Sequence, residues 1–266
     1  MASEPLAVLI DADNASPRII TGLLAEVANY GTAHVKRIYG DWTGPNLKGW
    51  KECLLEHSIQ PIQQFAYTTG KNATDGAMMI DAMDLLYTGR FTGFCIVSSD
   101  SDFARLAARI REQGLTVYGF GERKTPRPFI TACDKFVYVD VLGVPTAQAV
   151  PEDRQAEAVP AAKLGSSGSI PAQVAAVAAP APERSKLDKA ALAMITRAVT
   201  AAADEDGRAH LGRVGSLLIK QAADFDPRNY GFPRLIDLAQ ASGILDIERE
   251  GDGNKVVMVR LKEAKA

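Results

Sequence analysis

Cysteine is scarce in this sequence, and its three residues, Cys53, Cys95 and Cys133, form no Cys-x-x-Cys pair. This wide spacing argues against a disulfide framework and against a structural zinc site. Cys95 lies inside an apolar run, where we expect a buried and unreactive thiol. Histidine is equally scarce, and the three histidines do not have the spacing of metal ligands, so structural roles are expected for them.

Long apolar segments are also missing. No run approaches the roughly 20 residues that a helix needs to cross a bilayer. The N-terminal residues Met1–Pro5 have neither the basic nor the apolar region of a signal peptide. We therefore expect a cytoplasmic protein that has no membrane partner.

Neither sign of charge dominates. Lysine and arginine together number 30, against 32 aspartates and glutamates, which gives a formal net charge of −2. Overall charge therefore does not indicate a nucleic-acid-binding protein, and any contact with a nucleic acid must come from local clusters of basic side chains. A length of 266 residues suggests one large or two small domains, at about 150 residues per domain.

The most informative stretch is Leu6–Asn14. It begins with five apolar residues, which is too short a run for a helix and is typical of a buried strand. Two carboxylates and an amide, from Asp11, Asp13 and Asn14, follow directly. Because open α/β sheets bind ligands outside the carboxyl ends of their strands, these side chains should face a cleft.

A second apolar run, Phe94–Val97, ends in the same way, with Ser98–Asp102 directly before an amphipathic segment. Between the two runs, Lys71–Asp75 opens a predicted helix. If the three segments meet, several acidic side chains converge with little positive charge nearby. Carboxylates that close together have raised pKa values unless a cation compensates for their repulsion. Ligation by oxygen alone, with room for water, suits Mg²⁺ or Mn²⁺.

Strands and helices are expected to alternate through the N-terminal half. Further strands are predicted at 34–39, 59–62, 115–120 and 135–139, and helices at 17–27, 46–57, 75–86 and 101–113. This alternation predicts an α/β fold with a mostly parallel sheet of about six strands and helices on both faces. No Gly-x-Gly-x-x-Gly motif follows the first strand, and the acidic residues there would repel a pyrophosphate. A dinucleotide-binding enzyme is therefore disfavoured.

Composition divides the chain into three parts. Positions 143 to 184 contain 12 alanines and 6 prolines and few large apolar side chains. Such a segment cannot bury enough surface to offset the entropy lost on ordering, so we interpret residues 143–185 as a flexible linker. The linker separates an N-terminal domain, residues 1–142, from a C-terminal domain, residues 186–266.

The C-terminal part has the pattern of a small winged-helix (α+β) domain. Helical spacing begins at Leu187, and further helices are predicted at 211–222 and 232–241. Two predicted strands, 244–248 and 256–261, flank the turn Gly251–Asn254, whose residues favour a β-hairpin.

Three motifs carry a family resemblance. Ile10–Asn14, Lys71–Asp75 and Ser98–Phe103, in this order and spacing, resemble the NYN domain of the LabA-like branch, a relative of PIN ribonucleases, over residues 5–141. The resemblance implies a PIN-like three-layer fold and a metal-dependent ribonuclease. The acidic residues that match its catalytic and metal-site positions are Asp11, Asp75, Asp100 and Asp102. Asn14 and Ser98 match accompanying polar positions, and Asp81 also fits the family pattern.

Two more residues are candidates by position. Asp13 adds a second carboxylate at the end of the first strand, and Lys71 precedes the acidic helix by one loop. Lys71 could hold a phosphate of the substrate or pair with a carboxylate of the site. The alternative for Lys71 is an ordinary solvated lysine.

The stretch Phe225–Phe232, together with the closing hairpin, resembles the LOTUS (OST-HTH) domain over residues 186–262. The resemblance implies binding of single-stranded or structured RNA, or in some members of a protein partner. Arg228, Asn229, Tyr230 and Arg234 combine guanidinium groups with an aromatic ring, which suits phosphate contacts and base stacking. The alternative is that Tyr230 packs in the core beside a turn. A homo-oligomer is also compatible with the sequence.

Other interpretations stay open. Aspartates near helix starts can be simple caps, as Asp13 or Asp75 could be, although capping does not need two carboxylates at each of two strand ends. One alternative function is a non-catalytic, RNA-binding regulatory scaffold with a vestigial metal site. Another is a phosphatase that would use Asp11 as the nucleophile and Asp13 as the acid/base.

Overall fold

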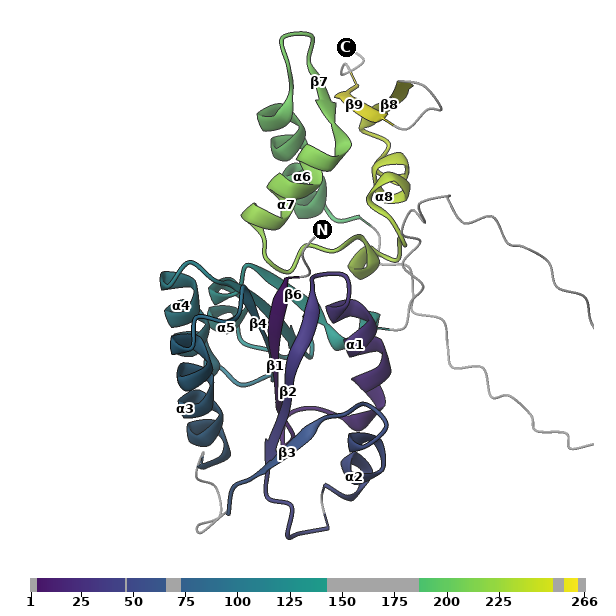
Figure 1. Ribbon diagram of the computed structural model, residues 1–266. Helices are drawn as coiled ribbons and strands as arrows, with labels where there is room; N and C mark the ends of the chain where they lie inside the picture. The colour runs from purple at the N-terminus through teal and green to yellow at the C-terminus, as the bar shows by residue number, and fades with distance from the viewer. Residues whose placement is uncertain (1–3, 46, 66–72, 143–186, 251–255, 263–266) are drawn as a thin grey trace, which may run out of the picture.

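The computed structural model describes residues 4–45, 47–65, 73–142, 187–250 and 256–262. The expected linker at 143–185, Lys71 and the hairpin turn at 251–254 lie outside these residues. The chain forms an N-terminal α/β domain and a smaller C-terminal domain that packs against it (Figure 1).

A six-stranded sheet forms the centre of the N-terminal domain, in the order β3-β2-β1-β4-β5-β6. The strands are β1 (Pro5–Asp11), β2 (Thr32–Gly40), β3 (Gln60–Gln63), β4 (Gly93–Val97), β5 (Thr116–Gly121) and β6 (Lys135–Tyr138). All five pairings are parallel, which confirms the predicted α/β class. Successive strands are added first on one side of β1 and then on the other, so the strand order reverses between β1 and β4.

Helices cover both faces of this sheet (Figure 1). The helices are α1 (Ile20–Val27) and α2 (Lys48–Leu54) on one face, and α3 (Ala73–Tyr87), α4 (Phe103–Glu112) and α5 (Arg127–Ala132) on the other. Side chains alternate across a strand. Phe94 and Ile96 of β4 accordingly join the core under α3, α4 and α5, whereas Cys95 and Val97 join the core under α1 and α2. The result is the predicted three-layer architecture.

Two predicted helices on one face of the sheet differ most clearly from the structure. The first turn of the segment after Ser16 is a 3-10 helix, Pro17–Ile19, in which Ser16 Oγ accepts a hydrogen bond from the Arg18 backbone at 3.4 Å. The helix predicted at 46–57 is shorter and ends at Leu54. Neither difference affects the strand ends that carry the acidic residues.

The C-terminal domain combines three helices with a small antiparallel sheet in the order β7-β9-β8. These elements are α6 (Lys189–Ala202), β7 (Arg208–His210), α7 (Leu211–Gln221), α8 (Leu235–Ser242), β8 (Leu245–Glu250) and β9 (Val256–Leu261). The helices and the hairpin strands agree with the winged-helix prediction, and β7 is an addition. Helix α8 starts at Leu235, later than predicted, and a 3-10 turn, Pro227–Tyr230, and the left-handed Gly231 precede it.

The two domains meet along the edge strand β6 and the C-terminal end of α1. The backbone nitrogen of Phe136 in β6 donates a hydrogen bond to the carbonyl of Ala223, at 2.8 Å. Figure 1 shows the C-terminal domain at the opposite end of the N-terminal domain from the start of α3. None of the helices in the described ranges has the length and apolar character needed to span a membrane.

Candidate metal centre

The ends of β1 and β4 bring the first and third acidic motifs together. The two strands are neighbours, and Ile10 pairs with Val97 one residue before each motif begins. Asp11 therefore lies beside Ser98, at the point where the strand order reverses. Open α/β sheets bind their ligands at such a switch point.

Three aspartates converge at this point. One carboxylate oxygen from each of Asp75, Asp100 and Asp102 lies within 4.8 Å of the other two. Asp75 comes from the first turn of α3 and is buried, Asp100 is half-buried, and Asp102 is exposed. A group of three carboxylate oxygens that is open to solvent on one side matches the donor set of a hard divalent cation such as Mg²⁺ or Mn²⁺.

The electrostatics of the group agree with a cation site. Burial and the repulsion from Asp11, Asp100, Asp102 and Asp13 raise the pKa of Asp75 to about 6. Burial also raises the pKa of Asp11, although hydrogen bonds to its carboxylate oppose this effect. Several carboxylates thus lie close together here, and a bound cation would relieve their mutual repulsion.

Asp11 lies next to this group of three aspartates, and hydrogen bonds within the protein hold its carboxylate. Its Oδ1 accepts hydrogen bonds from the backbone nitrogens of Asp13, at 3.0 Å, and Asn14, at 3.3 Å. Its Oδ2 accepts from Asn14 Nδ2, at 2.8 Å, and from Ser98 Oγ, at 2.7 Å. A carboxylate has about four acceptor positions, so these bonds occupy them all. Asp11 therefore ties the loop after β1 to the end of β4.

A chain of hydrogen bonds extends from Asp11 into the loop before α4. Ser98 Oγ, which donates to Asp11, accepts from the backbone nitrogen of Asp100 at 3.1 Å. Asp100 Oδ1 in turn accepts from the backbone nitrogen of Asp102 at 2.9 Å. Asp102 precedes α4 but makes no side-chain capping bond to that helix. The Asp102 side chain therefore does not cap α4.

Asp81 lies outside the three-aspartate group. Its two oxygens accept hydrogen bonds from Arg37 Nη1 and from the Tyr39 hydroxyl, both on β2. Tyr39 is also the register partner of Asp11 on the neighbouring strand. Asp81 therefore anchors α3 to the sheet beside the site. Asp84, one turn further along α3, is exposed, as expected for a solvated charge.

Two residues predicted to bind RNA are instead part of the contact between the domains. The Arg228 side chain is only 5% exposed and donates hydrogen bonds to Glu26 of α1 and to Asp226. Asn229 Oδ1 accepts a hydrogen bond from Arg123 of the N-terminal domain at 3.0 Å. Glu26 and Asp226 were not predicted as interface residues. An acidic residue on a helix gives no sequence signal for a partner in another domain.

The other two predicted RNA-binding residues are more accessible. Tyr230 is half-buried and packs beside Phe225, with ring centroids 6.0 Å apart. Together with Asn229 it lines a cavity of about 340 Å³ between the domains. Arg234 is exposed and forms an ion pair with Asp237 of α8 at 2.8 Å.

The N-terminal domain is thus an α/β domain with a six-stranded parallel sheet and a group of aspartates at its switch point. The NYN domain family matches residues 5–140, and the OST-HTH/LOTUS domain family matches residues 183–257. The chain therefore belongs to the NYN family and carries an OST-HTH/LOTUS domain after the NYN domain, as the two resemblances predicted.

Two solved structures are similar to parts of this chain. VPA0982 from Vibrio parahaemolyticus RIMD 2210633, a protein of unknown function, is 19% identical, with a TM-score of 0.45, and the match covers 52% of this chain and 94% of that protein. An uncharacterized protein from gene locus NE0665 of Nitrosomonas europaea is 29% identical, with a TM-score of 0.29, and covers 36% of this chain and 92% of that protein. No curated protein matches the chain.

Proposed function

We propose that this protein is a metal-dependent ribonuclease that hydrolyses phosphodiester bonds of RNA at Asp75, Asp100 and Asp102. The convergence of these three carboxylates from two separate segments is the observation that carries the proposal. Mg²⁺ or Mn²⁺, when bound, supplies the positive charge that activates water and stabilises the negative charge developing on the phosphodiester. The NYN family, as a relative of PIN nucleases, supports the reaction class.

The residues around the centre have distinct parts in this proposal. Asp75, Asp100 and Asp102 provide the oxygen ligands. Asp11 adds negative charge and, through Asn14 and Ser98, holds the loops that carry the ligands in position. Outer-shell hydrogen bonds of this kind orient ligands in metal sites generally.

Two further residues complete the site in the proposal. Asp13 is exposed at the rim, where it can contact water or substrate. Lys71, just before α3, contacts a phosphate of the RNA. The C-terminal domain belongs to a family that binds RNA, and its covalent connection raises the concentration of substrate near the centre.

The rival function is a non-catalytic scaffold that binds RNA and cuts nothing. Saturation of all the acceptor positions of Asp11 is the observation that favours it, because one of the four predicted ligands is then engaged elsewhere. The same burial and bonding count against the phosphatase alternative, in which Asp11 would have to attack a phosphate.

Turnover of labelled RNA with Mn²⁺ tests the proposal. We expect EDTA to abolish cleavage and Asp100→Asn to reduce it by more than the roughly 10–100-fold that loss of an outer-shell partner costs. Asp84→Asn, which removes an exposed carboxylate of α3 outside the centre, is the matched control and should cleave normally. If wild-type protein and Asp100→Asn bind RNA equally and neither cuts it, the scaffold is the correct function.

A further inference from the structure

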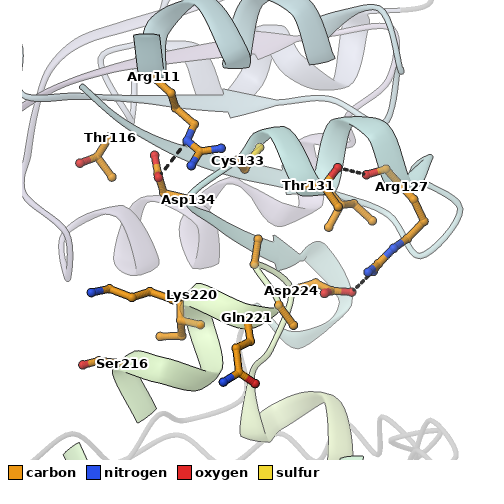
Figure 2. Close-up of a pocket in the computed structure, with 14 residues that line it drawn as sticks. Arg111, Thr116, Arg127, Thr131, Cys133, Asp134, Ser216, Lys220, Gln221 and Asp224 are labelled. Carbon is orange, nitrogen blue, oxygen red and sulfur yellow. Dashed lines mark hydrogen bonds and ion pairs between the residues drawn. The ribbon is translucent and has the colours of Figure 1, made fainter. Parts of the chain in front are cut away.

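A cleft of about 530 Å³ lies between the two domains, away from the metal centre (Figure 2). The N-terminal domain lines it with Arg111 of α4, with α5 and with the loop before β6. The C-terminal domain lines it with the second half of α7 and with the segment 222–224. Both domains therefore contribute side chains to one surface.

The cleft has an excess of positive charge. Its two carboxylates are already neutralised. Asp134 pairs with Arg111 at 2.9 Å, and Asp224 pairs with Arg127 at 2.8 Å. Lys220 adds a third cation, and no described residue forms an ion pair with it. Figure 2 shows the two ion pairs and the Lys220 side chain extending from α7.

Helix α7 presents Ser216 and Lys220 to this cleft. Arg213, Ser216 and Lys220 are three and four residues apart, so they lie along one face of the helix, and all three are exposed. Ser216 and Lys220 line the cleft, and Thr116 and Thr131 lie on the opposite wall. The hydroxyls of Ser216 and Thr131 donate to backbone oxygens within their own helices, so among the described lining residues the lysine is the main free donor on α7. None of the described lining residues is aromatic. Cationic side chains in a cleft without aromatic rings suit phosphate groups rather than bases.

We propose that this cleft binds the phosphodiester backbone of RNA, without sequence preference, while another part of the same strand occupies the metal centre. The identity of the ligand as RNA rests on the proposed function. An acidic protein segment is the other polyanion that the cleft could attract, and the experiment below separates the two.

Helix α4 sets the distance between the cleft and the metal centre. It follows Asp102 directly and contains 10 residues, with Arg111 in its last turn. At about 1.5 Å per residue this helix is roughly 15 Å long. An RNA strand stacked at about 3.4 Å per nucleotide needs about four to five nucleotides to cover that length. A dinucleotide can therefore bind at the metal centre, but it is too short to reach the cleft at the same time.

Binding of a fluorescent 20-nucleotide RNA to the full-length protein in EDTA tests the proposal without any cleavage. Each contact to a phosphate of a single strand adds about 0.7 to the slope of log K against log salt concentration. At 0.1 M salt, the loss of one such contact weakens binding by about fivefold. We expect Lys220→Glu and Arg111→Gln each to weaken binding by about that factor and to lower the salt slope by about 0.7. Lys189→Glu, an exposed charge reversal on α6 away from the cleft, should leave both unchanged.

Three results would overturn the proposal: wild-type protein that does not bind the RNA, equal losses in Lys189→Glu and Lys220→Glu, or Lys220-dependent binding of polyglutamate but not of RNA. Circular dichroism and thermal unfolding confirm that each variant is folded. Failure of the nuclease activity would leave these binding results untouched. If the wild type does cleave RNA, Lys220→Glu should slow cleavage of the 20-mer and spare a dinucleotide.

Discussion

Arg228 joins the two domains by donating two hydrogen bonds to the carboxylate of Glu26, which lies 202 residues earlier in the chain. Its Nη1 lies 2.9 Å from Glu26 Oε2, and its Nη2 lies 3.0 Å from Glu26 Oε1. The same guanidinium binds Asp226, and Lys135 lies 3.9 Å from Glu26, so two cations face two carboxylates. Burial would raise the pKa of Glu26, but the hydrogen bonds from Arg228 and Tyr30 and the attraction to both cations lower it.

Removal of Arg228 should separate the domains. Loss of one partner from a buried ion pair costs about 3–5 kcal/mol, because the remaining charge stays desolvated. Each domain has its own apolar core, so we expect Arg228→Met to appear as undocking rather than as complete unfolding. Small-angle X-ray scattering should show a larger radius of gyration, and calorimetry should show two thermal transitions. Arg234→Met is the control, because its pair with Asp237 is exposed and screened by solvent, so its loss should leave the docking of the domains unchanged. Identical scattering from the two variants would contradict this role of Arg228.

The layered fold follows from local patterns in the sequence. Short apolar runs such as Phe94–Val97 are buried on both faces of a parallel sheet, and this burial makes them recognisable. Strand β7, Arg208–His210, has no such pattern. It is a strand because it pairs with β9, about 50 residues further along the chain, so its three residues could not be predicted from their own composition.

The site was predictable in its location but not in its internal arrangement. Acidic residues at the ends of two strands indicate a switch-point site wherever the strands become neighbours. Whether Asp11 is a ligand or an organiser depends on the side-chain directions of Asn14 and Ser98, which spacing does not specify. The local sequence around Arg228 does not tell whether its side chain is exposed and binds RNA or is buried between the domains. The catalytic roles assigned to Asp75, Asp100 and Asp102 stay a prediction.

The pKa of Asp75 should make the metal-free protein sensitive to pH. Its ordinary value is 3.8, and burial with neighbouring carboxylates raises it to about 6 in the folded state. The folded protein thus holds this proton to higher pH than the unfolded chain does, so stability falls as the pH rises from 3.8 to about 6. In EDTA, the melting temperature of wild type should decline relative to Asp75→Asn across this window, and saturating Mn²⁺ should restore it at pH 7. If the melting temperatures of the two proteins change with pH in the same way, Asp75 is not the cause of the loss of stability.

The contact of Asp81 with β2 should matter for both stability and metal binding. Asp81→Asn removes the charge that faces Arg37, and leaving a partly buried group with a poor partner costs about 1–3 kcal/mol. Because α3 also carries Asp75, a looser α3 should weaken Mn²⁺ binding as well. Urea denaturation and titration calorimetry measure the two effects. Asp84→Asn, on the exposed face of the same helix, should change stability by less than about 0.5 kcal/mol and leave Mn²⁺ affinity unchanged.

Alanine substitution of two glycines of β5 should distinguish a loss of core packing from a loss of support for the metal centre. A Cβ atom at Gly121 would lie 2.6 Å from the backbone oxygen of Ser98, so Gly121→Ala should displace the residue whose hydroxyl holds Asp11. A Cβ atom at Gly119 would instead meet the side chains of Phe136 and Cys133, at 2.5 and 2.6 Å. Overpacking of this kind costs about 1–3 kcal/mol, so both alanine variants should unfold at lower urea concentration. Only Gly121→Ala should also bind Mn²⁺ more weakly, because only it moves the end of β4. Equal loss of Mn²⁺ affinity in the two variants would mean that Ser98 does not position the centre.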